Sequence, residues 1–238
     1  MVQRLVGMFR LTVLVQAVLL SPVTQAQPQK ADTPYPTRAP LDHYLMADQN
    51  SEIALARSAA PKAISDNAEV MVLDRQGYRT AIRGSNGFTC IVQRSWTAPF
   101  DDSEFWNPKL RSPMCLNEPG VRSYLPIIVE RTTLVVAGKS NPEIAAAMKD
   151  AVVKKKLPHL ESGAMGYMMS KDGYLSDHVG HWHPHLMIFF PLTGAKSWGA
   201  GLPGSPIFAF EDPTEGLTVF IVPVVTWSDG TTDSHNRN

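Results

Sequence analysis

Short β-strand patterns recur along this chain, and they are the feature that most limits its possible folds. Residues 69–74, 78–83 and 88–96 are apolar and β-branched or alternate between apolar and polar positions, and Asn86-Gly87 lies in the turn before the third segment. The Asn-Gly pair tolerates positive φ and is typical of hairpin turns. This spacing predicts that the three segments form an antiparallel meander.

More strands are predicted toward the C-terminus. The segments with a strand pattern are 166–170, 185–190, 207–211 and 217–225, and the apolar run 134–137 also reads as a strand. Alternation and β-branched content carry these assignments.

Two helices are expected beside the strands. The first follows Asp42, which can cap it, and ends before Pro61. The second begins at Asn141, with Pro142 at its first turn, and ends before Pro158. We therefore predict an α+β fold in which two helices pack on a mostly antiparallel sheet.

The N-terminus has the layout of a secretory signal peptide. Residues 1–10 are basic, residues 11–20 are apolar, and the small residues Thr24 and Ala26 precede a cleavage site. An uncleaved membrane anchor is the alternative, although Arg10 interrupts the apolar run that a span needs. We therefore expect residues 1–26 to be removed and the protein to be exported, either to a periplasm or to the exterior.

The rest of the chain is expected to form a single domain between flexible ends. Residues 27–40 contain four prolines and are predicted to be a flexible tether. Residues 41–228 would form the α+β domain. Residues 229–238 are polar and are predicted to be a disordered tail.

The charge balance argues against a nucleic-acid partner. The chain has 22 basic and 22 acidic residues, and removing Arg4 and Arg10 with the signal peptide leaves 20 basic residues. Phosphate binding needs clustered positive charge. No segment after residue 26 has the apolar length of a membrane span. The expected partner is a small molecule or a component of the cell envelope.

Two cysteines, Cys90 and Cys115, are candidates for a disulfide in an oxidising compartment. A bridge between them would close a loop of about 25 residues and stabilise the fold by roughly 3 kcal/mol. Two buried thiols or one reactive thiol are the alternatives, and no Cys-x-x-Cys motif supports a redox role.

Two glycine motifs resemble nucleotide-binding loops without their structural context. Residues 199–204 match Gly-x-Gly-x-x-Gly, but a strand pattern follows where a dinucleotide site needs a helix. Gly138-Lys139-Ser140 resembles the end of a phosphate loop, but Thr133 replaces the glycine that should begin the loop. We expect no nucleotide cofactor and a surface loop over residues 193–206.

A run of histidines is the strongest candidate for a functional site. Four of the seven histidines fall within eight positions, at His178, His181, His183 and His185. Gly180 and Pro184 oppose a helix, so the segment should be extended, with His181, His183 and His185 on one side. Neutral imidazole binds transition metals, and a catalytic zinc site needs three protein ligands. The run therefore predicts a site for a divalent ion, Zn or Cu.

Other residues are expected to border the same cleft. The candidates are Tyr174, Asp177, Trp182, Trp227 and Asp229. The irregular segment 97–126 is too long for a structureless connection and can form one wall of a cleft. A metal-free cleft that uses one histidine as a general base, or a purely structural histidine cluster, are the alternatives to a metal site.

Two functional hypotheses follow. One is an exported metal-dependent hydrolase, in which the bound ion lowers the pKa of its water. The other is an exported, non-enzymatic module that binds a small molecule or a cell-envelope partner. The sequence supports either class, enzyme or binding protein.

Overall fold

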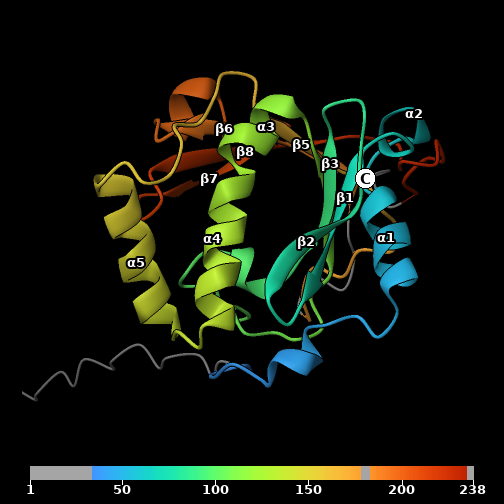
Figure 1. Ribbon diagram of the computed structural model, residues 1–238. Coiled ribbons are helices and arrows are strands. Elements are labelled where there is room, and N and C mark those ends of the chain that lie inside the picture. The colour runs from blue at the N-terminus through green and yellow to red at the C-terminus, as the bar shows by residue number, and fades with distance from the viewer. Residues whose placement is uncertain (1–33, 178–182, 235–238) are drawn as a thin grey trace, which may run out of the picture. The chain divides into compact units, whose positions relative to one another are not determined.

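An eight-stranded sheet runs through residues 34–177 and 183–234, the part of the chain that the computed structural model describes (Figure 1). The strand order is β2-β1-β3-β4-β5-β6-β8-β7. The strands are β1 (Glu69–Asp74), β2 (Gly77–Ile82), β3 (Thr89–Gln93), β4 (Ser112–Leu116), β5 (Met165–Met168), β6 (His185–Pro191), β7 (Phe208–Asp212) and β8 (Leu217–Pro223). All neighbours are antiparallel except β1 and β3. The predicted α+β class is confirmed.

The described residues form more helices than the two that the sequence predicts. They are α1 (Gln49–Arg57), α2 (Lys62–Ser65), α3 (Glu118–Ser123), α4 (Leu125–Val136) and α5 (Asn141–Val153), with the 3-10 turns η1 (Leu41–His43), η2 (Ser95–Thr97) and η3 (Ala195–Trp198). The cap of α1 is Asp48, which accepts hydrogen bonds from the backbone of Asn50 and Ser51, and Asp42 lies in η1 instead. Helix α5 begins where the sequence predicts, after Ser140.

The apolar run 134–137 was predicted to be a strand, and this is wrong. Residues 134–136 are the last residues of α4. The buried side chains of this helix include Ile128, Arg131, Thr132 and Val135, which recur with helical spacing. A short apolar run by itself does not distinguish a strand from a buried helix.

The predicted meander is also wrong, because β3 pairs with β1 rather than with β2. Its residues Thr89 and Cys90 lie beside Glu69 and Val70 in a parallel arrangement. The chain crosses the start of β1 through Gly84, where an added Cβ atom would lie 2.1 Å from the backbone nitrogen of Glu69. Glycine permits this close crossing.

Strand β4 lies inside the segment 97–126 that the sequence marks as irregular. Pro113 cannot donate a hydrogen bond to a neighbouring strand, so its presence argues against a strand in the sequence. In the structure Pro113 faces Val92 of β3, while β5 pairs only with Cys115 and Leu116. The missing N–H group therefore falls outside the paired length of β5.

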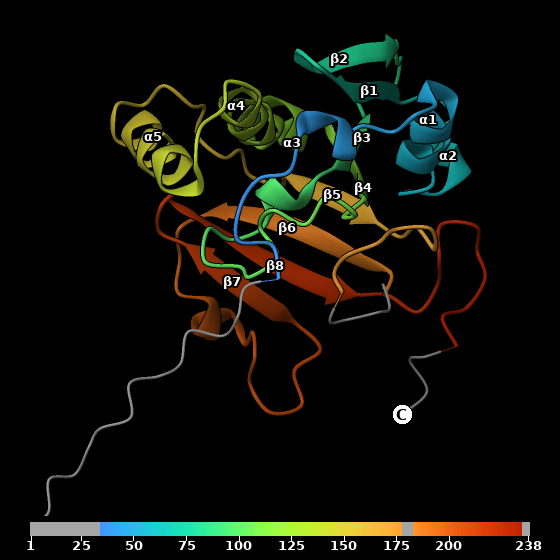
Figure 2. The ribbon, with the colours of Figure 1, turned by 90° about the horizontal axis from the view of Figure 1, so that it is seen from below.

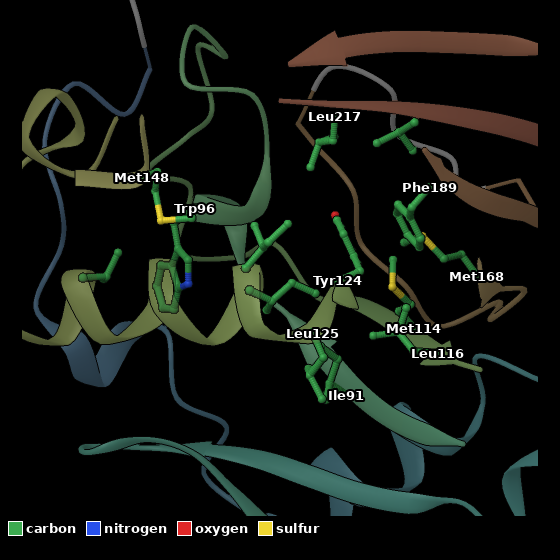
Figure 3. Close-up of a cluster of buried hydrophobic side chains, with 14 of the residues drawn as sticks. Ile91, Trp96, Met114, Leu116, Tyr124, Leu125, Met148, Met168, Phe189 and Leu217 are labelled. Carbon is green, nitrogen blue, oxygen red and sulfur yellow. The ribbon is translucent and has the colours of Figure 1, made fainter. Parts of the chain in front are cut away.

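The sheet separates two layers. Figure 2 shows α4 and α5 on one side of β6 and β8, and η3 on the other. On the helical side, Tyr124 at the start of α4 stacks on Phe189 with ring centroids 3.6 Å apart, within the buried cluster drawn in Figure 3. On the opposite side, Trp198 of η3 contacts Phe190 and Phe220, at centroid distances of 4.9 and 5.3 Å.

A disulfide joins Cys90 of β3 to Cys115 of β4. The two residues are direct partners across the antiparallel pair, and both are fully buried. Helix α1 covers them, because Ala56 belongs to the same apolar cluster. The bridge therefore links two central strands of the sheet.

Both ends of the described chain are held against the domain. Tyr35 and Arg38, in the expected tether, bond to Asp177 and to the backbone of Val135. Residues 229–234 differ from the expected disordered tail, because Asp233 is buried and Thr232 forms a bridge with Thr226. The proposed signal peptide lies outside the described residues. Among residues 34–177 and 183–234, none of the helices combines the length and the apolar character of a membrane span.

Candidate functional site

A cavity of about 400 Å³ lies on the helical side of the sheet. Six neighbouring strands supply its floor in sheet order, namely Gln93 from β3, Ser112 from β4, Met168 from β5, His185 and Met187 from β6, Ile221 from β8 and Phe210 from β7. We call this cavity the cleft. Ligand sites in proteins fall in the same size range, about 300–1,000 Å³.

The walls of the cleft come from three other segments. Residues between Thr97 and Leu110 form one wall, as expected for the irregular segment after β3. Tyr124, at the start of α4, and the residues Leu175 and His183, before β6, contribute the rest. Most of the lining is apolar, and its polar groups include the carboxylates of Asp102 and Glu104 and the imidazoles of His183 and His185.

His183 is oriented by a buried carboxylate. Its Nδ1 lies 2.8 Å from Oδ2 of Asp233. The imidazole is half exposed, whereas the side chain of Asp233 has no exposed surface. A carboxylate can only accept this hydrogen bond, so Nδ1 of His183 donates to it. The lone pair of the neutral ring is then on Nε2.

His185 has the same tautomer for a different reason. Its Nδ1 lies 2.7 Å from the backbone carbonyl oxygen of His183 and donates to it. Burial lowers the pKa of His185, and the nearby imidazole of His183 adds to this effect. His185 is therefore neutral at pH 7. Both imidazoles line the same cleft, and in each neutral ring Nε2 is the basic nitrogen.

Glu104 provides a buried carboxylate in the wall. Its oxygens accept hydrogen bonds from the backbone N–H of Asp177, at 3.0 and 2.9 Å, and from the side-chain amide of Asn107, at 2.6 Å. The side chain is almost fully buried and lines the cleft together with the exposed Asp102. The lining of the cleft thus contains acids as well as imidazoles.

Asp177 and Tyr174 form a polar cluster beside the cleft. The carboxylate of Asp177 accepts hydrogen bonds from the hydroxyl groups of Tyr174 and Tyr35, and Nζ of Lys109 lies 3.2 Å away. These contacts, led by the Tyr174 hydroxyl, lower the pKa of Asp177 to about 2. The cluster fixes the chain just before the histidine run.

A buried ion cluster supports the other part of the 97–110 wall. Arg131 of α4 bonds to Glu215 and to Asp212, and it donates to the carbonyl groups of Trp96 and Ala98 at 2.9 and 2.7 Å. Burial raises the pKa of Glu215, while Arg131 acts in the opposite direction. The cluster ties the wall to the turn between β7 and β8.

Two of the described candidates, Trp227 and Asp229, do not line the cleft. Trp227 is buried in the main core cluster, and Asp229 forms an exposed ion pair with Lys171 at 2.7 Å. His178, His181 and Trp182 lie outside the described residues. Among residues 34–177 and 183–234, no group of three or more histidine, cysteine or acidic side chains is arranged to hold a metal ion.

Sequence reasoning missed Asp233 and Glu104. Asp233 is fifty residues from His183 in a polar stretch that carries no strand or helix pattern, so no local signal marks it. Glu104 lies in a segment identified as a possible wall, but its burial depends on hydrogen bonds to Asn107 and to the distant Asp177.

Comparison with known proteins identified no protein that is similar to this chain. No protein-family model matches the chain, and neither a curated protein nor a solved structure shows significant similarity to it. The geometry of the cleft is therefore the basis for assigning a function.

Proposed function

We propose that this chain is an exported protein that binds a small molecule with an apolar body in the cleft, and that His183 contacts its polar end. The observation that carries the proposal is the floor, to which six strands each contribute a side chain beneath about 400 Å³ of space. A predominantly apolar cavity with a few convergent polar groups is the usual form of a ligand site.

The pairing of His183 with Asp233 supports a defined role for the imidazole. A buried acceptor on Nδ1 fixes both the tautomer and the ring orientation, as it does for histidines that act as general bases or hydrogen-bond acceptors. His183 would accept a hydrogen bond from the ligand through Nε2. In an enzyme, the same nitrogen would remove a proton from a bound substrate or water.

Fluorescence of N-phenyl-1-naphthylamine, an uncharged dye that brightens in apolar sites, tests the binding proposal. The mature wild-type protein should enhance its emission saturably. Met187→Trp, which fills the floor, should abolish the enhancement. Val153→Trp places the same side chain on an exposed position of α5 and serves as the control. Equal enhancement by both variants, or none by the wild type, would refute binding in the cleft.

A transition-metal site is the second candidate function, and it would make the protein a metal-dependent hydrolase. The observation in its favour is that His183 and His185 both donate from Nδ1 to an oxygen, which leaves Nε2 as the basic nitrogen of each. Metal-bound histidines have this outer hydrogen bond almost without exception.

Equilibrium dialysis against Zn²⁺ and Cu²⁺ separates the two candidates. If the metal proposal is right, His183→Ala/His185→Ala should lose bound metal, while His43→Ala/His159→Ala, which removes two histidines outside the cleft, should retain it. Equal metal content in the two double variants would exclude a site on His183 and His185, without affecting the dye experiment.

Export is tested separately. The proposed signal peptide predicts that protein recovered from outside the cytoplasm begins at Gln27. Sequencing of the N-terminus measures this directly, and a mature chain that still begins at Met1 would contradict cleavage.

A further inference from the structure

We infer that Gln93 and Ser112 form a hydrogen-bonding pair in the floor of the cleft, and that this pair selects ligands with an uncharged amide group. The inference rests on the proposed function, since it names a chemical class of ligand for the same cleft. It is drawn from two buried polar side chains whose hydrogen-bonding capacity is not used within the protein.

Gln93 and Ser112 are neighbours across two central strands. They are direct partners in the antiparallel pairing of β3 with β4, and both line the cleft. The side chains of such partners lie on one face of a sheet, with Cβ atoms about 5 Å apart. Only 4% of Gln93 and 5% of Ser112 is exposed. One small group in the cleft can therefore contact both side chains.

The contact with Met114 fixes the orientation of the Gln93 amide. Nε2 of Gln93 lies 3.2 Å from Sδ of Met114, which is one position from Pro113 on β4. A thioether sulfur accepts hydrogen bonds and cannot donate them, so the amide nitrogen is the group that faces it. The carbonyl oxygen Oε1 is the end of the amide that remains for a ligand.

Oε1 of Gln93 and Oγ of Ser112 both reach open space. Neither atom has a hydrogen-bond partner among the described residues. In that part of the chain, the polar side-chain atoms that have neither a partner nor exposed surface are Nε of Arg57 and Oγ of Ser95. Oε1 and the Ser112 hydroxyl are not among them, so each has some exposed surface. The cleft is the space that both residues line.

The two groups together complement an amide. Oε1 is an acceptor and requires a donor from the ligand, whereas the Ser112 hydroxyl can donate to a carbonyl oxygen. An amide offers an N–H and a C=O on neighbouring atoms. A buried polar group that is left without a partner costs free energy, so a ligand that satisfies both groups is favoured over one that satisfies only the hydroxyl.

This contact is separate from the histidines. Strand β5 lies between β4 and β6, so Ser112 and His185 belong to strands about 10 Å apart. Met168 of β5 lines the floor between them. A ligand that reaches an imidazole as well as the pair therefore has polar groups at both ends of its apolar body.

Two nearly isosteric compounds test the inference. In 3-phenylpropanamide an NH₂ group replaces the terminal methyl group of 4-phenylbutan-2-one, and the aromatic body and the carbonyl group are shared. Calorimetric titration measures the Kd of each compound with the wild type and with Gln93→Met, which removes the acceptor and keeps an unbranched side chain. The two compounds differ in hydration, but this difference is the same for both proteins and cancels. We expect the ratio of the ketone Kd to the amide Kd to fall about tenfold in Gln93→Met.

Three further variants identify the source of the preference. Ser112→Ala removes the donor to the carbonyl group that both compounds possess, so it should weaken both by about three- to tenfold and leave the ratio near the wild-type value. Gln76→Met makes the glutamine exchange in an exposed turn and should change neither Kd. Should Gln93→Met fail to fold, Gln93→Asn withdraws the amide by one methylene group and should lower the ratio in the same direction.

The outcomes separate this inference from the proposed function. If the dye binds in the cleft but the ratio is equal in the wild type and Gln93→Met, or neither compound binds to the wild type, the amide preference is wrong and the cleft remains a binding site. Unchanged constants in Ser112→Ala would overturn the pairing of the two residues. If the dye does not bind in the cleft, the proposed function fails and the inference fails with it.

Discussion

Asp233 and His183 are joined by a 2.8 Å hydrogen bond across fifty residues of chain, and the carboxylate is fully buried while the imidazole is half exposed. The backbone N–H of Asp233 in turn donates to Val225, just after β8. The imidazole is thus oriented by a carboxylate that the segment after β8 holds in place.

Replacing this carboxylate should weaken whatever His183 binds. For Asp233→Asn we expect at least about a tenfold loss of Zn²⁺ affinity if the metal proposal holds, because outer-shell partners of ligating histidines contribute to that extent. The free energy of unfolding should fall by about 1–3 kcal/mol. Calorimetric titration and urea denaturation measure the two effects. Asp229→Asn, which removes an exposed acid that pairs with Lys171, should change neither beyond error.

The buried bridge between β3 and β4 should contribute substantially to stability. Cys90→Ala/Cys115→Ala frees a loop with a sequence separation of 25. The loop-entropy relation gives a loss of about 3 kcal/mol, or roughly 6–12 °C in Tm for a protein of this size. Thermal melts of wild type and variant measure the shift. An unchanged melting temperature would show that the two strands hold their pairing without the bond.

Arg131 should support the cleft wall as well as the fold. Arg131→Met leaves Asp212 and Glu215 buried without their cation and releases the carbonyl groups of Trp96 and Ala98. Removing one member of a buried ion pair lowers the free energy of unfolding by about 3–5 kcal/mol. We also expect weaker dye binding, because the 97–110 wall loses this support. Normal dye affinity in the folded fraction of the variant would show that the wall is held by its other contacts.

The raised pKa of Glu215 should make the stability of the protein depend on pH. Burial raises its folded-state pKa above the ordinary value of 4.5. The folded state therefore binds the proton more readily than the unfolded chain. The stabilising contribution of protonation is complete below pH 4.5 and is lost as the pH rises through the folded pKa.

Glu215→Gln removes this contribution. The free energy of unfolding of the wild type, relative to the variant, should therefore increase as the pH is lowered from neutrality toward 4.5. Urea denaturation across this interval measures it, and Glu118→Gln, at an exposed position of α3, provides the control. A relative stability that falls on acidification would mean that Arg131 dominates and that the carboxylate pKa is lowered instead.

The sequence predicts local features of this protein better than its long-range pairings. The strand patterns near β5, β6, β7 and β8 and the helix after Ser140 appear in the structure, because alternation and capping are properties of neighbouring residues. The parallel pairing of β3 with β1 and the strand around Pro113 do not follow from local pattern, because they depend on which strands become neighbours.

The candidate site divides in the same way. The alternation of residues 183 and 185 suggests a shared side, and both side chains line the cleft. The carboxylates that accompany them come from residues 104 and 233, which only the fold brings near. The sequence also marks Tyr174 and Asp177 as neighbours of the site, and in the structure they bond to each other beside it.

A floor assembled from six consecutive strands couples occupancy to the integrity of the sheet. None of these strands can separate from its neighbours without dismantling the surface on which the bound molecule rests. A ligand that binds only the folded state should therefore slow amide exchange in β3 as well as in β7. It should also raise the melting temperature, and the increase should grow with the ligand concentration. The melting curve itself is then a way to find the natural ligand.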